Sequence, residues 1–122
     1  MSDAKRAARA FGLRAETLAT LWLRAQWFRI LDRNYRVQGG EIDIVAQRGH
    51  LIVFVEVKAR ADLETAALAI TPQKQRRIQR AVHHWLARHP RSTDCAFRAD
   101  AILIAPGHLP QRIAGVFDLA IG

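Results

Sequence analysis

The chain has 122 residues, of which half are hydrophobic and a quarter are charged. This length and composition fit one modest globular domain and exclude a wholly disordered chain. The 19 Lys and Arg residues exceed the 11 Asp and Glu residues, and the net charge of +8 suits a polyanionic partner such as nucleic acid, although biased genome composition is an alternative reading.

The first predicted elements are an arm, a helix and a strand. Residues 1–12 are expected to form a flexible, basic N-terminal arm, and residues 13–122 a single domain. From about 13 to 28 the apolar residues recur at spacings of three and four, which predicts a helix with a buried stripe of Leu18, Leu21, Trp22, Ala25 and Phe28. A short strand over about 30–37 is expected before the break at Gly39-Gly40.

Two further strands follow in quick succession, over residues 41–47 and 51–58. The pair Gly49-His50 between them predicts a type II′ hairpin, because Gly first in a two-residue loop adopts the required positive φ. Residues 59–70 are expected to be a loop. Thr71 as cap and Pro72 at the first helical position then predict a second helix that Pro90 stops, with a buried stripe of Ile78, Ala81, Val82, Trp85 and Leu86.

Strands over residues 97–105 and 113–119, with a turn at Pro106-Gly107, complete the chain. The order α-β-β-β-α-β-β predicts an α/β fold with a mixed sheet flanked by helices. The single cysteine, Cys95, excludes an intrachain disulfide and favours a reducing compartment. The start of the chain lacks the apolar stretch of a signal peptide, and the longest strongly apolar run, 51–55, is too short to cross a bilayer. We therefore expect a cytoplasmic protein with no membrane partner.

The predicted hairpin carries the chemistry. If its two-residue loop forms, opposed residues have numbers that sum to 99, so that Asp43 faces Glu56 and Glu41 faces Lys58, all four on one face of the sheet. Two opposed acids repel unless a cation lies between them. A lysine can provide this positive charge. Mg²⁺ suits the position better, because its ligands are carboxylates, waters and phosphate oxygens. Because unpaired charges are costly to bury, we expect a cleft open to water. The alternative is a plain salt bridge from Glu41 to Lys58 with the other acids solvated.

The same hairpin carries a resemblance. Residues 40–45, Gly-Glu-Ile-Asp-Ile-Val, and 53–60, Val-Phe-Val-Glu-Val-Lys-Ala-Arg, resemble the YraN-like family of uncharacterised bacterial proteins. That family is similar to the restriction-endonuclease-like fold, whose signature is an acid, a short gap and Glu-x-Lys, and its nearest functional relatives are the archaeal Holliday-junction resolvases. The match covers nearly the whole chain, with segments at 15–16, 33–34, 71–74 and 98–100, and has Ala99 where the family has Phe.

The resemblance implies a restriction-endonuclease-like, three-layer α/β/α fold and a site that binds Mg²⁺ or Mn²⁺. The expected metal ligands are Asp43, Glu56, the backbone carbonyl of Val57 and Glu41. Lys58 would orient the attacking water or stabilise charge on the phosphate. Glu16, from the first predicted helix, would supply a metal contact or a base.

A basic face on the second predicted helix is a further candidate site. It lies opposite the buried stripe, and no acid occurs from 71 to 91, which favours a ridge that contacts phosphates over an ordinary solvated face. The expected nucleic-acid contacts are Lys74, Gln73, Arg77, Arg80 and, just beyond Glu-x-Lys, Arg60. Trp22, Trp27 and Trp85 are candidates for stacking on bases, although Trp22 and Trp85 lie on core stripes, which favours packing.

These features together predict a metal-dependent endonuclease or nuclease-like protein that acts on DNA, including branched structures. One alternative is a nucleic-acid-binding module that keeps the fold and catalyses nothing. Another is an interaction or scaffold protein whose acids are structural. By analogy with resolvases, we also expect a homodimer.

Overall fold

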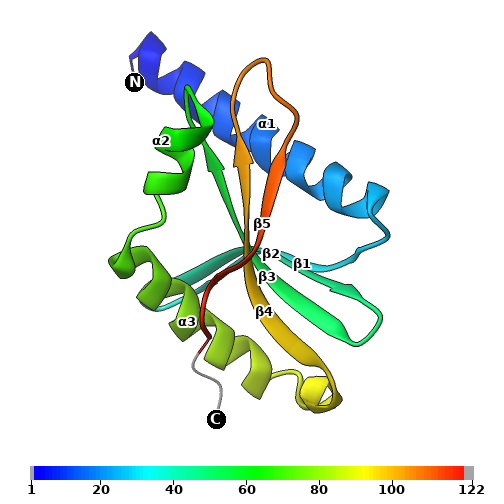
Figure 1. The fold of residues 1–122 in the computed structure, drawn as a ribbon. Coiled ribbons are helices and arrows are strands. Elements are labelled where there is room, and N and C mark those ends of the chain that lie inside the picture. The colour runs from blue at the N-terminus through cyan, green and yellow to red at the C-terminus, as the bar shows by residue number, and fades with distance from the viewer. Residues whose placement is uncertain (1, 120–122) are drawn as a thin grey trace.

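The computed structural model describes residues 2–119, except for the side chains of residues 4, 7–13, 91 and 93. Its elements are α1 (Asp3–Ala25), β1 (Arg29–Val37), β2 (Gly40–Arg48), β3 (Leu51–Ala59), α2 (Leu63–Leu68), α3 (Pro72–Ala87), the 3₁₀ helix η1 (Pro90–Asp94), β4 (Ala96–Ile104) and β5 (Gln111–Phe117) (Figure 1). The strands form one five-stranded sheet in the order β1-β2-β3-β4-β5. Strands β3 and β4 are parallel and the other neighbouring pairs are antiparallel.

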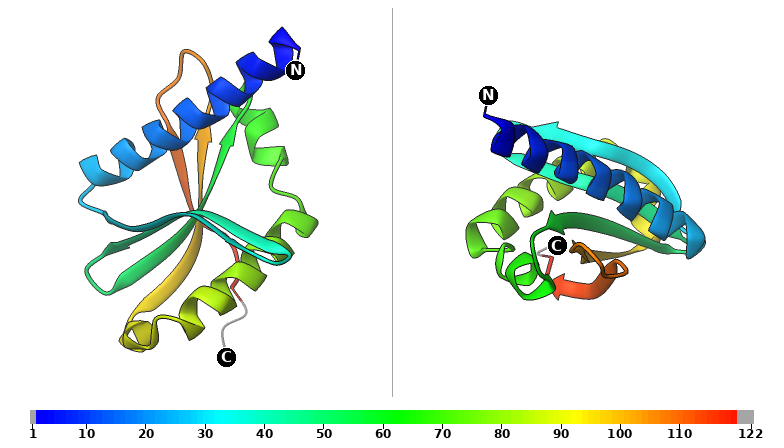
Figure 2. Two further views of the ribbon diagram at one scale, coloured as in Figure 1. Left: turned by 180° about the vertical axis from the view of Figure 1, so that it is seen from behind. Right: turned by 90° about the horizontal axis from the view of Figure 1, so that it is seen from above.

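Helices cover both faces of this sheet, which confirms the predicted three-layer α/β/α architecture (Figure 2). Helix α1 packs on one face, in a cluster that includes Ala15, Ala19, Leu23, Ile44 and Val55. Helix α3 packs on the other face, in a cluster that includes Val45, Phe54, Ile78, Val82 and Trp85. None of the helices within residues 2–119 combines the length and hydropathy that crossing a lipid bilayer requires.

The extent of α1 differs from the prediction. The helix begins at Asp3, because Ser2 caps it and its Oγ accepts a hydrogen bond from the backbone N–H of Lys5 at 3.2 Å. The segment predicted as an arm is therefore helical from Asp3 onward, and Met1 lies outside the described residues. The helix ends at Ala25, short of the predicted end near Phe28.

The buried face of α1 also differs from the prediction. Leu18 and Leu21, placed on the core stripe, are 41% and 55% exposed. The buried residues of the described part of this helix are Ala15, Ala19, Thr20 and Leu23. Both stripes satisfy a helical period. The small side chains of Ala15 and Ala19 allow the helix backbone to approach the sheet closely, and this tertiary contact selected the face.

The segment between β3 and β4 holds one unpredicted helix and one predicted one. The short helix α2 lies where a loop was expected, and the Asp62 side chain caps it by accepting from the backbone N–H of Thr65 at 2.7 Å. Helix α3 confirms its prediction: the Thr71 Oγ1 accepts from the backbone N–H of Lys74 at 3.2 Å, and the predicted stripe is buried except for Leu86, which is half-buried.

The hairpin of β2 and β3 confirms the predicted register over half its length. Residues pair from Arg48 with Leu51 to Ile44 with Val55. Gly49 has φ +60°, as its place in the turn requires. Beyond Ile44 and Val55 the paired register ends and the strands diverge (Figure 2, left), so the predicted pairs of 43 with 56 and 41 with 58 were wrong. Ile42 packs in the α3-side cluster and Ile44 in the α1-side cluster, which places a break in the side-chain alternation at residue 43.

Candidate functional site

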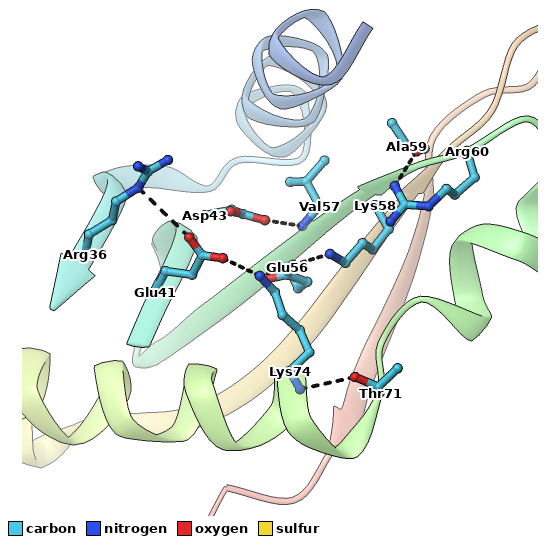
Figure 3. A network of polar contacts seen from close by, with 10 residues as sticks. All are labelled: Arg36, Glu41, Asp43, Glu56, Val57, Lys58, Ala59, Arg60, Thr71 and Lys74. Atoms are coloured by element: carbon cyan, nitrogen blue, oxygen red, sulfur yellow. Dashed lines mark hydrogen bonds and ion pairs between the residues drawn. The ribbon is translucent and has the colours of Figure 1, made fainter. Parts of the chain in front are cut away.

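Asp43 lies in the gap that opens where β2 and β3 diverge. Its Oδ2 accepts a hydrogen bond from the backbone N–H of Val57 at 2.8 Å, so a side chain satisfies an amide that a regular ladder would have paired (Figure 3). Burial raises the pKa of Asp43, and the Val57 N–H opposes that rise. Val57 thus contributes its backbone N–H to the site. A metal-binding role for its carbonyl stays a prediction.

Glu56 is the deeply buried acid of the site, with 2% of its surface exposed. Its Oε1 lies 3.0 Å from the Nζ of Lys58 and 3.4 Å from the Nζ of Lys74. Burial, reinforced by the charge of Asp43, nevertheless raises the pKa of Glu56 to about 7. Its Oε2 has no hydrogen-bond partner among the described residues. The site therefore holds a carboxylate that titrates near neutral pH and has one unsatisfied oxygen.

Helix α3 brings a second lysine into the site. The cap at Thr71 sets the first turn of α3, from which the Nζ of Lys74 pairs with the Oε1 of Glu41 (Figure 3). The Oε2 of Glu41 also lies 3.9 Å from the Nε of Arg36. The hydrogen bond from Lys74 is the main cause that lowers the pKa of Glu41. Lys74 was predicted to contact phosphate. Its ion pairs with Glu41 and Glu56 were not predicted, because the hairpin and the helix meet only in the tertiary fold.

The close approach of α3 to β2 depends on Gly40. A Cβ at this position would lie 2.6 Å from the carbonyl oxygen of Arg77 and 2.9 Å from the backbone N of Ala81. Both distances are shorter than van der Waals contact allows, so only glycine permits this packing. Gly40 was predicted as a break between strands, and the structure shows that it seats the helix carrying Lys74 beside Glu41.

Helix α1 contributes Glu16 from the other face of the sheet. Its Oε1 is buried and has no hydrogen-bond partner among the described residues. Burial raises the pKa of Glu16 and the charge of Asp43 raises it further, while Arg33, Arg36 and Asn34 oppose the rise. The charge of Asp43 thus acts on Glu16, while a metal contact or a base role for Glu16 stays a prediction.

The donor set suits a hard divalent cation. Glu16 and Glu56 each have a buried carboxylate oxygen without a partner, and carboxylate oxygens are the ligands that Mg²⁺ and Mn²⁺ prefer. Within residues 2–119, no group of three or more His, Cys, Asp or Glu side chains is arranged to hold a metal ion. Mg²⁺ is commonly bound by one or two carboxylates with waters and substrate phosphates, and Asp43 and Glu56 are the candidate carboxylates for such a site.

A basic face of α3 borders the site. A polar hollow of about 300 Å³ is lined by Gly39, Gln73, Arg76, Arg77 and Arg80. The last four of these side chains are exposed, and no ion pair within the described part of the chain involves the three arginines. Gly39 and Gln73, which line the hollow, are close in the chain to Glu41 and Lys74 of the acidic site.

Arg60 lies apart from this hollow, at the end of β3. Its side chain is exposed, and its Nη1 donates to the carbonyl oxygen of Ala59 at 2.7 Å, close to Lys58 (Figure 3). The predicted nucleic-acid contacts thus fall into two groups, one along α3 and one at the end of β3.

A second buried acid, Asp100 on β4, has a structural role. Arg98 donates to both of its oxygens, at 2.7 Å from Nε and 2.8 Å from Nη2. Arg112 and the backbone N–H of Gly115 donate to the same carboxylate at 3.2 and 3.0 Å. Both oxygens of Asp100 are satisfied, whereas Glu56 keeps one free, and this difference distinguishes a structural acid from a candidate ligand.

Comparisons with known proteins identify a family and similar relatives. The model of uncharacterised protein family UPF0102 matches residues 15–104, which include every acid and lysine of the site described above. A UPF0102 protein of Methylocella silvestris is 48% identical over 121 residues, which cover 99% of this chain and 98% of that protein. UPF0102 proteins of Bradyrhizobium diazoefficiens and Rhodopseudomonas palustris are 51% and 50% identical over 107 residues, which cover 88% of this chain and 80% and 82% of theirs.

Proposed function

The chain belongs to uncharacterised protein family UPF0102, the YraN-like family, and we propose that it is a metal-dependent nuclease that acts on DNA. The observation that carries the proposal is the buried carboxylate of Glu56, which lies beside Asp43, touches Lys58 and keeps one oxygen unsatisfied. An unpartnered buried carboxylate oxygen is costly, and sites that retain one are candidates for binding a cation or for catalysis.

The chemistry follows from the side chains around this oxygen. Asp43 and Glu56 would hold Mg²⁺ or Mn²⁺, which supplies Lewis acidity and lowers the pKa of bound water. The ammonium of Lys58, 3.0 Å from Glu56, would move to the phosphate and neutralise the charge that develops there. Glu16, whose pKa is raised by burial, would accept a proton from the attacking water near neutral pH.

The basic face of α3 would hold the substrate. Arg76, Arg77 and Arg80 have no carboxylate partners among the described residues, so a phosphate does not have to break existing ion pairs to reach them. Gly39 and Gln73, which also line this hollow, are close in the chain to Glu41 and Lys74, which would place bound phosphates next to the acidic site. A homodimer with two such sites, as branched DNA would require, stays a prediction.

Cleavage of a DNA panel tests the proposal. Linear, flapped and four-way DNA are incubated with wild type, Glu56→Gln and Lys58→Ala in Mg²⁺ or Mn²⁺. We expect metal-dependent cleavage by wild type and a loss of about 100-fold or more in both variants. Glu64→Gln, at an exposed glutamate of α2, controls for the loss of one carboxylate and should retain activity. Equal cleavage by wild type and both site variants would reveal a contaminant and end the nuclease proposal.

A second candidate function is nucleic-acid binding without catalysis. It is favoured by one observation: Lys58 and Lys74 already neutralise Glu56 and Glu41 without a metal ion. Calorimetric titration with Mg²⁺ separates the two candidates, because only the nuclease predicts binding that Asp43→Ala abolishes. A binding module instead predicts no metal binding together with a gel shift whose affinity falls steeply with salt.

A further inference from the structure

Helix α1 ends in a turn that normally selects glycine. The backbone N–H of Phe28 donates to the carbonyl of Leu23, and that of Trp27 donates to the carbonyl of Arg24, both at 3.0 Å. These two bonds define a Schellman motif, with Trp27 at the position that is usually glycine. Trp27 consequently has φ +70°, a left-handed conformation that side chains with a Cβ disfavour. The side chains of Phe28 and Leu23 are buried in the core cluster on the α1 side of the sheet and anchor this turn.

Packing does not explain why a tryptophan occupies position 27. It is 86% exposed, the largest exposed fraction among the large hydrophobic residues of the described part of the chain. Neither the backbone conformation nor the core therefore accounts for a tryptophan at this position. Exposed tryptophans with a fixed backbone are favoured where a flat aromatic surface contacts a partner.

The surroundings of Trp27 indicate an anionic partner. Arg24, Arg29 and Arg48 are exposed, and no ion pair within residues 2–119 involves any of them. Arg48 is the last residue of β2. Its Nη1 donates to the carbonyl of Gln26, just beyond the end of α1, at 3.1 Å, and its guanidinium carbon lies 4.4 Å from the centroid of the Phe28 ring. An exposed tryptophan with arginines that lack acidic partners at nearby positions has the composition of surfaces that bind single-stranded nucleic acid.

We propose that Trp27, Arg24, Arg29 and Arg48, here the Trp27 patch, bind an unpaired stretch of nucleic acid. A base stacks on the indole and the flanking phosphates contact the arginines. The choice of nucleic acid over protein follows from arginines that have no acidic partner and from the net charge of +8, and it rests in part on the proposed function. The patch lies about 15 Å along α1 from Glu16, so a single-stranded arm of a flap or junction could reach it from the acidic site.

Binding in EDTA tests this patch independently of catalysis. Fluorescence anisotropy measures the affinity of each variant for an oligothymidylate of about 16 nucleotides and for an abasic strand of the same length. Trp27→Gly is the central variant, because glycine relaxes the left-handed residue and should raise thermal stability while it removes the ring. Trp27→Phe keeps an aromatic ring, and Trp27→Leu keeps only an apolar side chain. Leu68→Ala, at a leucine that is 74% exposed on α2, is the matched control.

We expect Trp27→Gly and Trp27→Leu to weaken oligothymidylate binding by about 5- to 150-fold, with Trp27→Phe and Leu68→Ala close to wild type. The abasic strand should bind wild type as weakly as oligothymidylate binds Trp27→Gly. Unchanged affinity in Trp27→Gly would overturn the proposal, as would equal wild-type affinity for the two strands. Wild-type affinity in Trp27→Leu would also overturn it, because an apolar contact would then replace base stacking. If wild type fails to cleave DNA in the cleavage assay but the variants show this binding pattern, only the proposal of nuclease activity is refuted.

Discussion

Replacing Glu56 with glutamine removes the buried charge and keeps the size of the side chain. Burial raises the pKa of Glu56 from 4.5 to about 7. Between these two pH values the folded protein therefore holds a proton on Glu56 that the unfolded chain has released. Because the folded state binds more protons in this window, the free energy of unfolding falls as the pH rises from 4.5 to 7 and then levels off.

The size of this effect follows from the two pKa values. The difference between 7 and 4.5, at about 1.36 kcal/mol for each pH unit, gives about 3 kcal/mol of stability lost by wild type across the window. The free energy of unfolding of a native protein is roughly 5–15 kcal/mol, so this loss would be a large part of it. Glu56→Gln cannot ionise there, so the variant should gain about 3 kcal/mol relative to wild type between pH 4.5 and pH 8.

Urea unfolding followed by circular dichroism at a series of pH values measures this difference. Glu64→Gln, at an exposed residue of α2, is the matched control and should follow wild type. Parallel stability curves for wild type and Glu56→Gln would refute the reasoning, because they would mean that burial does not penalise the charge of Glu56. Mg²⁺ at about 100 times its Kd should restore roughly 2.7 kcal/mol to wild type at pH 8 and nothing to Glu56→Gln, if the ion binds there.

Three other substitutions test the contacts around the site. Gly40→Ala places a Cβ 2.6 Å from the backbone of α3, so urea unfolding should show a loss of about 1–3 kcal/mol in the free energy of unfolding. A variant as stable as wild type would contradict the close approach of α3 to β2. Asp100→Asn breaks a fully paired buried acid and should cost about 3–5 kcal/mol by the same method, and a loss below about 1 kcal/mol would argue against a structural role. Lys74→Ala should raise the pKa of Glu41 in an NMR titration, and more than the control Arg77→Ala does, because Lys74 is the main cause that lowers it.

The strand register beside the turn could be predicted from the sequence because a tight turn constrains its neighbours. With the loop at Gly49 and His50, residues 44–48 can pair with 51–55 in only one register, and the structure has that register. The cap at Thr71 likewise set the start of α3. The ion pairs of Lys74 carried no such local signal, because Lys74 and Glu41 are far apart in the chain and meet only through the contact at Gly40.

The sequence by itself determined the order of the five strands and the two long helices and the strand register beside the turn, because turns, caps and hydrophobic periods act over a few residues. Only the tertiary structure decided which stripe of α1 is buried, where β2 and β3 diverge, and that Trp27 occupies the glycine position of a Schellman motif. Each of these depends on how whole elements pack, since two helix faces or two strand lengths can satisfy the same local pattern until a neighbouring layer selects one.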